Sequence, residues 1–132
     1  MENAGPARVA VIEDHPEHFD YLVALLRRAG YAVAAFDDAK SALCHLAHSP
    51  ANLVITDVFM PEMDGFELLK ELQEAHPGVP LIAVSGAASR DCTDFLACMK
   101  KLGARAVFTK PVDATELLDT VALLVERGDG PG

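Results

Sequence analysis

The chain has 132 residues, of which 51% are hydrophobic, and it carries a formal net charge of -9. This length suits one domain with a hydrophobic core. The negative charge argues against binding to nucleic acid or to an anionic membrane surface. No apolar run approaches the roughly 20 residues of a membrane span, and the first residues lack the pattern of a signal peptide. We therefore expect a cytoplasmic protein whose partners are other proteins or cations.

Short apolar runs alternate with segments that carry apolar residues at helical spacing. Strands are expected at residues 8–12, 31–36, 53–57, 79–85 and 106–109, and helices at 16–29, 38–48, 64–75, 89–102 and 113–127. This alternation predicts a single doubly wound α/β domain with a five-stranded parallel sheet. Right-handed crossovers favour the flavodoxin-like order 2-1-3-4-5. We expect residues 8–127 to form the domain, between flexible tails at 1–7 and 128–132.

Residues that start or stop helices fall at the expected boundaries. Two acidic pairs have the spacing of a capping box, in which side chains bond to the free N–H groups of a first turn. Proline suits a first turn because its missing N–H would be unpaired there, and glycine favours a helix end. These signals are Asp64 with Glu67, Asp113 with Glu116, Pro16 and Gly30.

Polar side chains stand where four of the predicted strands end. Glu13 and Asp14 follow the first strand, and Asp57 ends the third. Ser85 ends the fourth strand and Lys110 follows the fifth. In a parallel sheet these carboxyl ends share one edge, where open α/β sheets bind their ligands. The first and third strands are neighbours in the predicted order, so we expect the three acids to converge.

Three converging carboxylates repel one another unless a cation offsets their charge. Hard oxygen ligands favour Mg²⁺, which binds a few carboxylates and keeps waters that a phosphate oxygen can replace. Lys110 adds a point charge suited to a phosphoryl oxygen, and Ser85 adds a hydroxyl donor. This set fits attack of the Asp57 carboxylate on a phosphorus atom, which forms an aspartyl phosphate. Such an acyl phosphate hydrolyses readily and makes a temporary mark.

Taken together in this order, the strand-end motifs resemble those of the response-regulator receiver domain of two-component phosphorelay systems. The resemblance covers about residues 8–126, and its motifs are specific only in combination. They are the acidic pair Glu13-Asp14, the series Asp57, Met60-Pro61 and Asp64-Gly65, the pair Ser85-Gly86, and Thr109-Lys110-Pro111.

The resemblance implies a role for each site residue. Asp57 would be the phosphoacceptor. Asp14, together with Glu13 through a water molecule, would hold Mg²⁺ along with Asp57 and the backbone carbonyl of Phe59. Lys110 would pair with the phosphoryl group.

The resemblance also implies how the signal passes through the domain. Ser85 would be a switch hydroxyl that moves toward the phosphoryl group, and the Lys110–Pro111 bond would be cis. The donor would be a phosphohistidine on a sensor histidine kinase or a phosphotransfer protein. The surface of the fourth helix, fifth strand and fifth helix would respond and would meet a downstream protein or a second copy. The protein would catalyse only its own phosphorylation and slow dephosphorylation.

Two positions depart from the usual pattern of the family. Receivers commonly have an aromatic residue three positions before the lysine, and here that residue is Val107. Its neighbour Phe108 cannot substitute, because adjacent strand residues face opposite ways. Phe59 and Ala87 stand at positions that tune how water reaches the phosphoryl group, and their apolar side chains suggest slow self-hydrolysis.

Other functions remain open on the sequence alone. A phosphatase with an aspartate nucleophile usually needs a second acid two residues later, where this chain has Phe59. A flavodoxin-like cofactor carrier would need a phosphate-binding loop rich in Gly, Ser or Thr after the first strand. A receiver that only docks without being phosphorylated is a further alternative. The sequence also leaves open whether the domain acts alone or belongs to a hybrid kinase or larger regulator.

The histidine and cysteine patterns predict no additional site. His15 with His18, and His45 with His48, have ligand-like spacing but lack the further ligands of a closed zinc site. The chain has three cysteines and no C-x-x-C pair, which argues against a disulfide framework.

Overall fold

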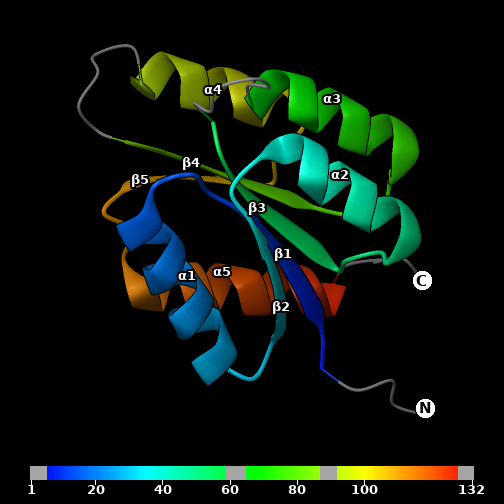
Figure 1. Ribbon diagram of the computed structural model, residues 1–132. Coiled ribbons are helices and arrows are strands. Elements are labelled where there is room, and N and C mark those ends of the chain that lie inside the picture. Colours follow the sequence, from blue (N-terminus) through cyan, green and yellow to red (C-terminus); the bar gives the residue numbers. More distant parts are fainter. Residues whose placement is uncertain (1–5, 59–64, 87–91, 128–132) are drawn as a thin grey trace.

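The computed structural model describes residues 6–58, 65–86 and 92–127 of the chain. Within these ranges one parallel five-stranded sheet has the order β2-β1-β3-β4-β5 (Figure 1). Its strands are β1 (Arg8–Ile12), β2 (Ala32–Phe36), β3 (Leu53–Asp57), β4 (Leu81–Gly86) and β5 (Ala106–Lys110). The predicted fold class and strand order are confirmed. Residues 1–5 and 128–132, which belong to the expected tails, lie outside the described residues.

Helices cover both faces of the sheet. They are α1 (Pro16–Arg28), α2 (Ala39–His48), α3 (Gly65–Ala75), α4 (Cys92–Leu102) and α5 (Ala114–Arg127). Figure 1 shows α1 and α5 on one face and α2, α3 and α4 on the other. In the part of the chain that the structure describes, no helix combines the length and the apolar character needed to cross a membrane.

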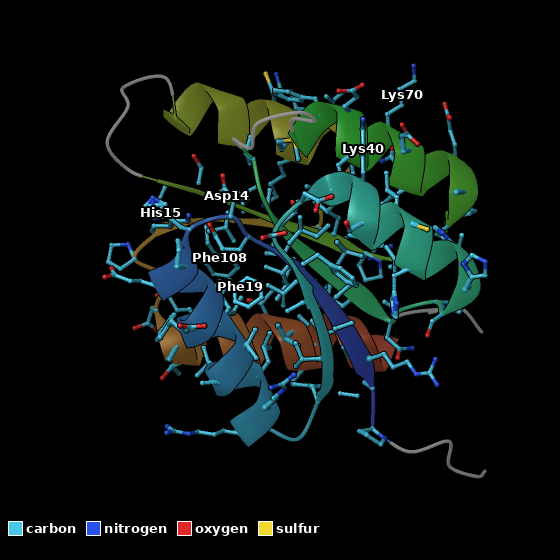
Figure 2. All side chains as sticks on the ribbon, in the orientation of Figure 1. Asp14, His15, Phe19, Lys40, Lys70 and Phe108 are labelled. Atoms are coloured by element: carbon cyan, nitrogen blue, oxygen red, sulfur yellow. The ribbon has the colours of Figure 1, made fainter. Side chains whose placement is uncertain are left out.

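The sheet divides the hydrophobic core into two clusters. One cluster joins the sheet to α2, α3 and α4, and the other joins it to α1 and α5. Every residue of the central strand β3 is buried, since helices cover it on both sides. Val107 packs against the first cluster and Phe108 against the second, on the side that α1 covers (Figure 2). The two residues therefore face opposite ways, as expected.

Local signals explain two of the helix boundaries, the start of α5 and the end of α1. The Asp113 carboxylate accepts the backbone N–H of Glu116 at 2.9 Å, which is one half of the predicted capping box. Gly30, just past α1, has a φ of +100° that favours glycine. The Asp64 half of the other box, and the expected helix start at Ser89, lie outside the described residues.

The fourth strand begins later than predicted. We expected it to start at Val79, but β4 begins at Leu81. Proline has no N–H to give to a strand ladder, so Pro80 contributes only its carbonyl, which accepts the N–H of Val54 at 3.0 Å. The N–H of Val79 instead closes a turn onto the carbonyl of His76 at 3.1 Å.

Candidate functional site

The carboxyl ends of β1 and β3 bring three acids together. Pairing of Ile12 with Thr56 places the two strand ends side by side. Ligand oxygens of Glu13, Asp14 and Asp57 all lie within 4.8 Å of one another. The convergence that the sequence predicts is therefore confirmed. Figure 2 shows Asp14 where the chain leaves β1 for α1.

Lys110 joins two of these acids across the end of β4. Its Nζ atom lies 2.9 Å from Oδ2 of Asp57 and 3.0 Å from Oε2 of Glu13. Burial is the largest single influence and lowers the pKa of Lys110. The hydrogen bonds to Asp57 and Glu13, with the charges of both carboxylates, together outweigh burial and raise this pKa above its ordinary 10.5. Lys110 therefore stays an ammonium ion that neutralises part of the acidic cluster.

Glu13 is a buried carboxylate whose two oxygens both have hydrogen-bond partners. Its Oε2 atom accepts from Lys110 and from the backbone N–H of His15, the latter at 3.0 Å. Its Oε1 atom lies 2.8 Å from Nδ1 of His18. Burial alone would raise the pKa of Glu13, but the bonds from His18, His15 and Lys110 lower it from 4.5 to about 2. Glu13 is thus ionised at neutral pH despite being only 1% exposed.

Sequence reasoning missed the contact between His18 and Glu13. His18 lies in the first turn of α1, directly after Pro16 and Glu17. Side chains of a helix lean toward its N-terminus, which here is the side of the strand end that carries Glu13. The spacing of His18 from Pro16 could therefore have indicated a contact with the site. In the sequence, His18 stands out only for its spacing from His15, which resembles that of metal ligands.

Ser85 lies at the same edge of the sheet but is fully buried. Its hydroxyl donates to the carbonyl of Gly86 at 3.4 Å. In the β4–β5 ladder Ser85 pairs with Thr109, and Gly86 pairs with Lys110. Ser85 therefore directly precedes the β4 residue that pairs with Lys110. Phe59, whose carbonyl was the remaining expected ligand, lies outside the described residues.

The donor set fits a hard divalent cation. Three carboxylates face one ammonium group, which leaves net negative charge on the cluster. Asp14 is exposed and Asp57 is 6% exposed. Oxygen ligands that leave open positions for water suit Mg²⁺ better than they suit metals that prefer nitrogen or sulfur ligands.

Two hollows flank the site, one on each side of α1. One has a volume of about 460 Å³ and is lined by Asp14, Phe19 and Phe36, among others. The other has a volume of about 510 Å³ and lies between the start of α1 and the segment Lys110–Val112. The first hollow is lined by Glu13 and Asp14 and the second by His18 and Lys110, so the two open onto different parts of the site.

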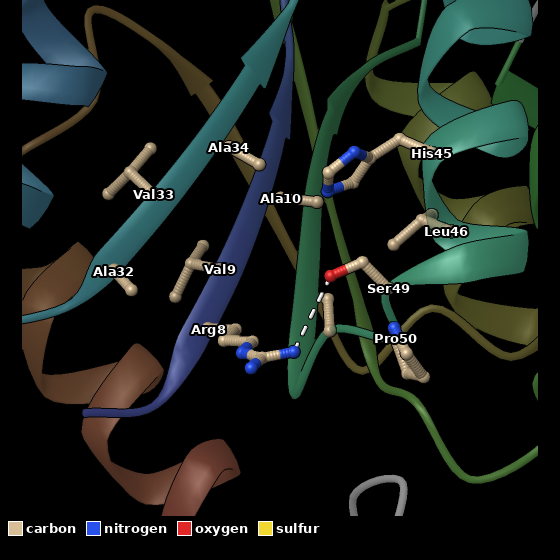
Figure 3. Close-up of a pocket in the computed structure, with 11 residues that line it drawn as sticks. Arg8, Val9, Ala10, Ala32, Val33, Ala34, His45, Leu46, Ser49 and Pro50 are labelled. Atoms are coloured by element: carbon tan, nitrogen blue, oxygen red, sulfur yellow. Dashed lines mark hydrogen bonds between the residues drawn. The ribbon is translucent and has the colours of Figure 1, made fainter. Parts of the chain in front are cut away.

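A third, smaller hollow lies at the opposite end of the sheet (Figure 3). Its volume of about 170 Å³ is below the roughly 300 Å³ typical of small-molecule sites. It lies beneath α2, where Ala10, Ala32 and Ala34 have side chains too small to fill the space. Its polar groups include Arg8 and Ser49, which are 3.4 Å apart and far from the acidic cluster along β1. This hollow is a packing feature and not part of the site.

A match over most of the chain shows to which protein family it belongs. A model of the response regulator receiver domain family matches residues 9–122. The chain belongs to this family. The response regulator receiver protein CpdR of Brucella abortus is 38% identical over 82 residues, which make up 62% of this chain and 68% of that protein.

Longer relatives and solved structures agree with this assignment. The sensory transduction protein RegX3 of Mycolicibacterium smegmatis is 33% identical over 120 residues, covering 91% of this chain and 51% of that protein. The chain thus spans only about half the length of RegX3. The crystal structure of a response regulator receiver domain protein from Clostridium thermocellum has a TM-score of 0.84 and 26% identity, covering 92% and 95% of the two chains. A similar receiver from Methanospirillum hungatei has a TM-score of 0.82 and 28% identity, covering 93% and 96%.

Family membership establishes the general function of this receiver domain. Receiver domains of two-component response regulators take part in phosphoryl-accepting signalling, and they act as switches and not as conventional enzymes. They interact with histidine kinases or phosphotransfer proteins. The peptide bond between Lys110 and Pro111 is cis, as the resemblance implied.

Proposed function

We propose that this receiver domain accepts a phosphoryl group on Asp57 in a Mg²⁺-dependent reaction, with a phosphohistidine as the donor. The observation that carries the proposal is the bridge from Lys110 to both Asp57 and Glu13, at 2.9 and 3.0 Å, inside an acidic cluster. A partly exposed ammonium ion beside a buried carboxylate suits a site that must bind a dianionic phosphoryl group without losing its nucleophile.

The chemistry assigns a task to each side chain. A carboxylate oxygen of Asp57 forms the new O–P bond while the P–N bond to the donor imidazole breaks. The imidazole nitrogen keeps the electron pair of that bond. Lys110 donates hydrogen bonds to the phosphoryl oxygens, on which negative charge is spread in the transition state. The raised pKa of Lys110 supports this task, because the ammonium form persists throughout the physiological pH range.

The acidic cluster would hold the cation. We assign Asp14 and Asp57 as ligands through their carboxylates, Glu13 through water, and Phe59 through its backbone carbonyl. When bound, Mg²⁺ neutralises charge on the phosphoryl oxygens and so favours their approach to three carboxylates.

The output of the switch follows from the neighbours of the site. Ser85 would move toward the phosphoryl group and shift the segment that follows it, altering the surface of α4, β5 and α5. Val107 packs into the cluster that includes α4, where it replaces the aromatic residue that is usual at this position. We therefore propose that shifts of α4 itself, and not the rotation of an aromatic side chain, carry the signal to a downstream protein or a second copy.

Phosphorylation by a small donor tests the proposal directly. Acetyl phosphate and Mg²⁺ should add the mass of one phosphoryl group to the wild-type chain, and chelation of Mg²⁺ should prevent the addition. The Asp57→Ala variant should stay unmodified. Asp119→Asn, which changes an exposed acid on α5, is the matched control and should be labelled like the wild type. A wild-type chain that stays unmodified, or an Asp57→Ala chain that is labelled, would overturn the proposal.

A further inference from the structure

Glu13 forms hydrogen bonds with three groups, and among the described residues only His18 forms one with its Oε1 atom. Lys110 and the backbone N–H of His15 both bond to Oε2. His18 contacts Oε1 through Nδ1 at 2.8 Å. An ionised carboxylate only accepts hydrogen bonds, so Nδ1 of His18 is the donor. The hydrogen bond from His18 therefore fixes the orientation of the Glu13 carboxylate.

The imidazole ring of His18 is itself fixed in place. Its side chain is 12% exposed, and its ring centre lies 5.9 Å from that of Tyr21, one turn further along α1. The Tyr21 hydroxyl donates to the carbonyl of Val112 at 3.0 Å, which ties α1 to the segment after Lys110. The other ring nitrogen of His18, Nε2, is buried and has no hydrogen-bond partner within the described ranges. The bond to Glu13 is thus the polar contact that orients the ring.

From this geometry we infer that His18 is a positioning residue for the cation site, acting through Glu13. This inference rests on the proposed function, because it concerns the Mg²⁺ that the proposed reaction needs. Without His18, the Glu13 carboxylate can rotate until both of its oxygens face the ammonium group of Lys110. Glu13 is then turned away from Asp14 and Asp57, and Lys110 is drawn away from Asp57. His18 prevents this rotation and keeps the three acids grouped.

Groups that orient metal ligands from outside the coordination shell have measurable effects on affinity. Replacing such a group typically weakens metal binding by about 10-fold to 100-fold. Because Glu13 would act through water, we expect the lower end of that range, about 10-fold, for loss of the His18 donor. This loss of Mg²⁺ affinity should disappear when Glu13 has been replaced and can no longer accept the hydrogen bond from His18.

Calorimetric titration with Mg²⁺ tests the inference without requiring any phosphorylation. His18→Phe keeps an aromatic ring beside Tyr21 but removes both ring nitrogens, and its Mg²⁺ affinity should fall by about 10-fold. His18→Gln offers an amide donor to Glu13 and should recover most of the affinity. Tyr21→Phe removes the hydroxyl bond to Val112 and should leave the affinity unchanged. If His18→Phe does not fold, His18→Leu carries the same comparison.

The same substitution of His18, made in a chain that already carries Glu13→Gln, distinguishes a positioning role from a general structural one. In a Glu13→Gln chain, replacing His18 by Phe should weaken Mg²⁺ binding no further, since residues that act through one another are not additive. Equal Mg²⁺ affinities of the wild type and His18→Phe would overturn the role of His18 and leave the proposed function standing. Tighter Mg²⁺ binding by His18→Phe would also overturn it. So would a loss of Mg²⁺ affinity in the Glu13→Gln background as large as the loss in the wild-type background. A wild-type chain that binds no Mg²⁺ would instead refute the proposed function.

Discussion

The ammonium group of Lys110 reaches across the end of β4 to lie 2.9 Å from the carboxylate of Asp57 on β3. Fifty-three positions separate the two residues in the sequence. The same ammonium group lies 3.0 Å from the carboxylate of Glu13, which follows β1, so one cation bonds to carboxylates at the ends of two other strands. Two opposite consequences follow from this arrangement. Lys110 neutralises the acids that would hold a metal, and it stands ready to bind a phosphoryl oxygen.

Replacing Lys110 by Met should therefore separate metal binding from phosphorylation. Met keeps a long apolar side chain but removes the charge, so Mg²⁺ should bind more tightly to the remaining carboxylates. Phosphorylation of Asp57 should nevertheless become slower, by roughly 100-fold, because a charged donor to the transition state is lost. Calorimetry measures the first effect, and labelling with acetyl phosphate at saturating Mg²⁺ measures the second.

Lys70→Met is the matched control for this experiment. Lys70 is an exposed lysine on α3 (Figure 2), and its replacement removes the same charge from the chain. It should change neither the affinity for Mg²⁺ nor the labelling rate. If Lys110→Met changed both quantities in the same direction, the dual role assigned to Lys110 would be wrong.

The stability of the domain should fall in acid because of Glu13. Its pKa is about 2 in the folded chain, compared with 4.5 ordinarily, since the bonds from His18, His15 and Lys110 outweigh the effect of burial. A carboxyl group with a lowered folded pKa stabilises the fold above its unfolded pKa. That contribution, on the order of 3 kcal/mol, is lost as the pH falls from about 4.5 to about 2.

Urea unfolding between pH 7 and pH 2, with a chelator present, measures this dependence. The Glu13→Gln variant should be less stable at pH 7 and should lose less further stability on acidification than the wild type. Glu71→Gln, an exposed carboxylate on α3, should keep the wild-type profile. A Glu13→Gln profile parallel to that of the wild type would show that Glu13 does not cause the acid sensitivity.

Much of the site could be predicted from the sequence because strand ends share an edge. Alternation of strands and helices determined the sheet, and the sheet placed Glu13, Asp14, Asp57 and Lys110 together. Their type and order along the chain were enough to indicate phosphoryl chemistry. This part of the prediction depended only on topology, which is robust to errors of one or two residues at element boundaries.

The contacts that hold the site could not be predicted in the same way. Helical periodicity tells which face of α1 is buried but not which atom the ring of His18 reaches. The strand pattern places Lys110 at the edge of the sheet but does not show that it bonds to two acids at once. The late start of β4 could have been anticipated, because Pro80 has no N–H to donate. Side-chain geometry depends on packing from several elements, which the sequence pattern of one element does not contain.

Gly65 is expected to be sensitive to even the smallest substitution. Its N–H donates to the carbonyl of Val58 at 2.8 Å, so α3 begins against the end of β3. A Cβ atom added to Gly65 would lie 3.0 Å from Cα of Val58 and 3.4 Å from Cε of Met99. The backbone of a buried strand end cannot move aside easily, so Gly65→Ala should destabilise the domain by about 1–3 kcal/mol.

Thermal or urea unfolding measures the cost at Gly65. Gly86→Ala is the matched control, since a Cβ atom at Gly86 meets no atom of the described residues within 4 Å, and it should be close to the wild type in stability. Equal stability of Gly65→Ala and the wild type would show that the backbone at Val58 moves aside more readily than the 3.0 Å contact implies.

Gly103 and Gln73 should be coupled at the end of α4. Gly103 has a φ of +125°, and the Gln73 amide donates to the carbonyl of Leu102 at 2.9 Å. A Cβ atom at Gly103 would clash with Nε2 of Gln73, which would have to leave Leu102. Gly103→Ala therefore has two costs, the backbone strain of about 1–2 kcal/mol and the lost hydrogen bond of about 0.5–1 kcal/mol. In a Gln73→Ala background only the strain remains, because the amide is already absent.

Urea unfolding of the two single variants and the double variant measures this coupling. The double variant should lose less free energy of unfolding than the two single variants lose in total. The difference should be roughly the contribution of that one hydrogen bond. Strict additivity would mean that Gln73 moves aside without losing its contact with α4.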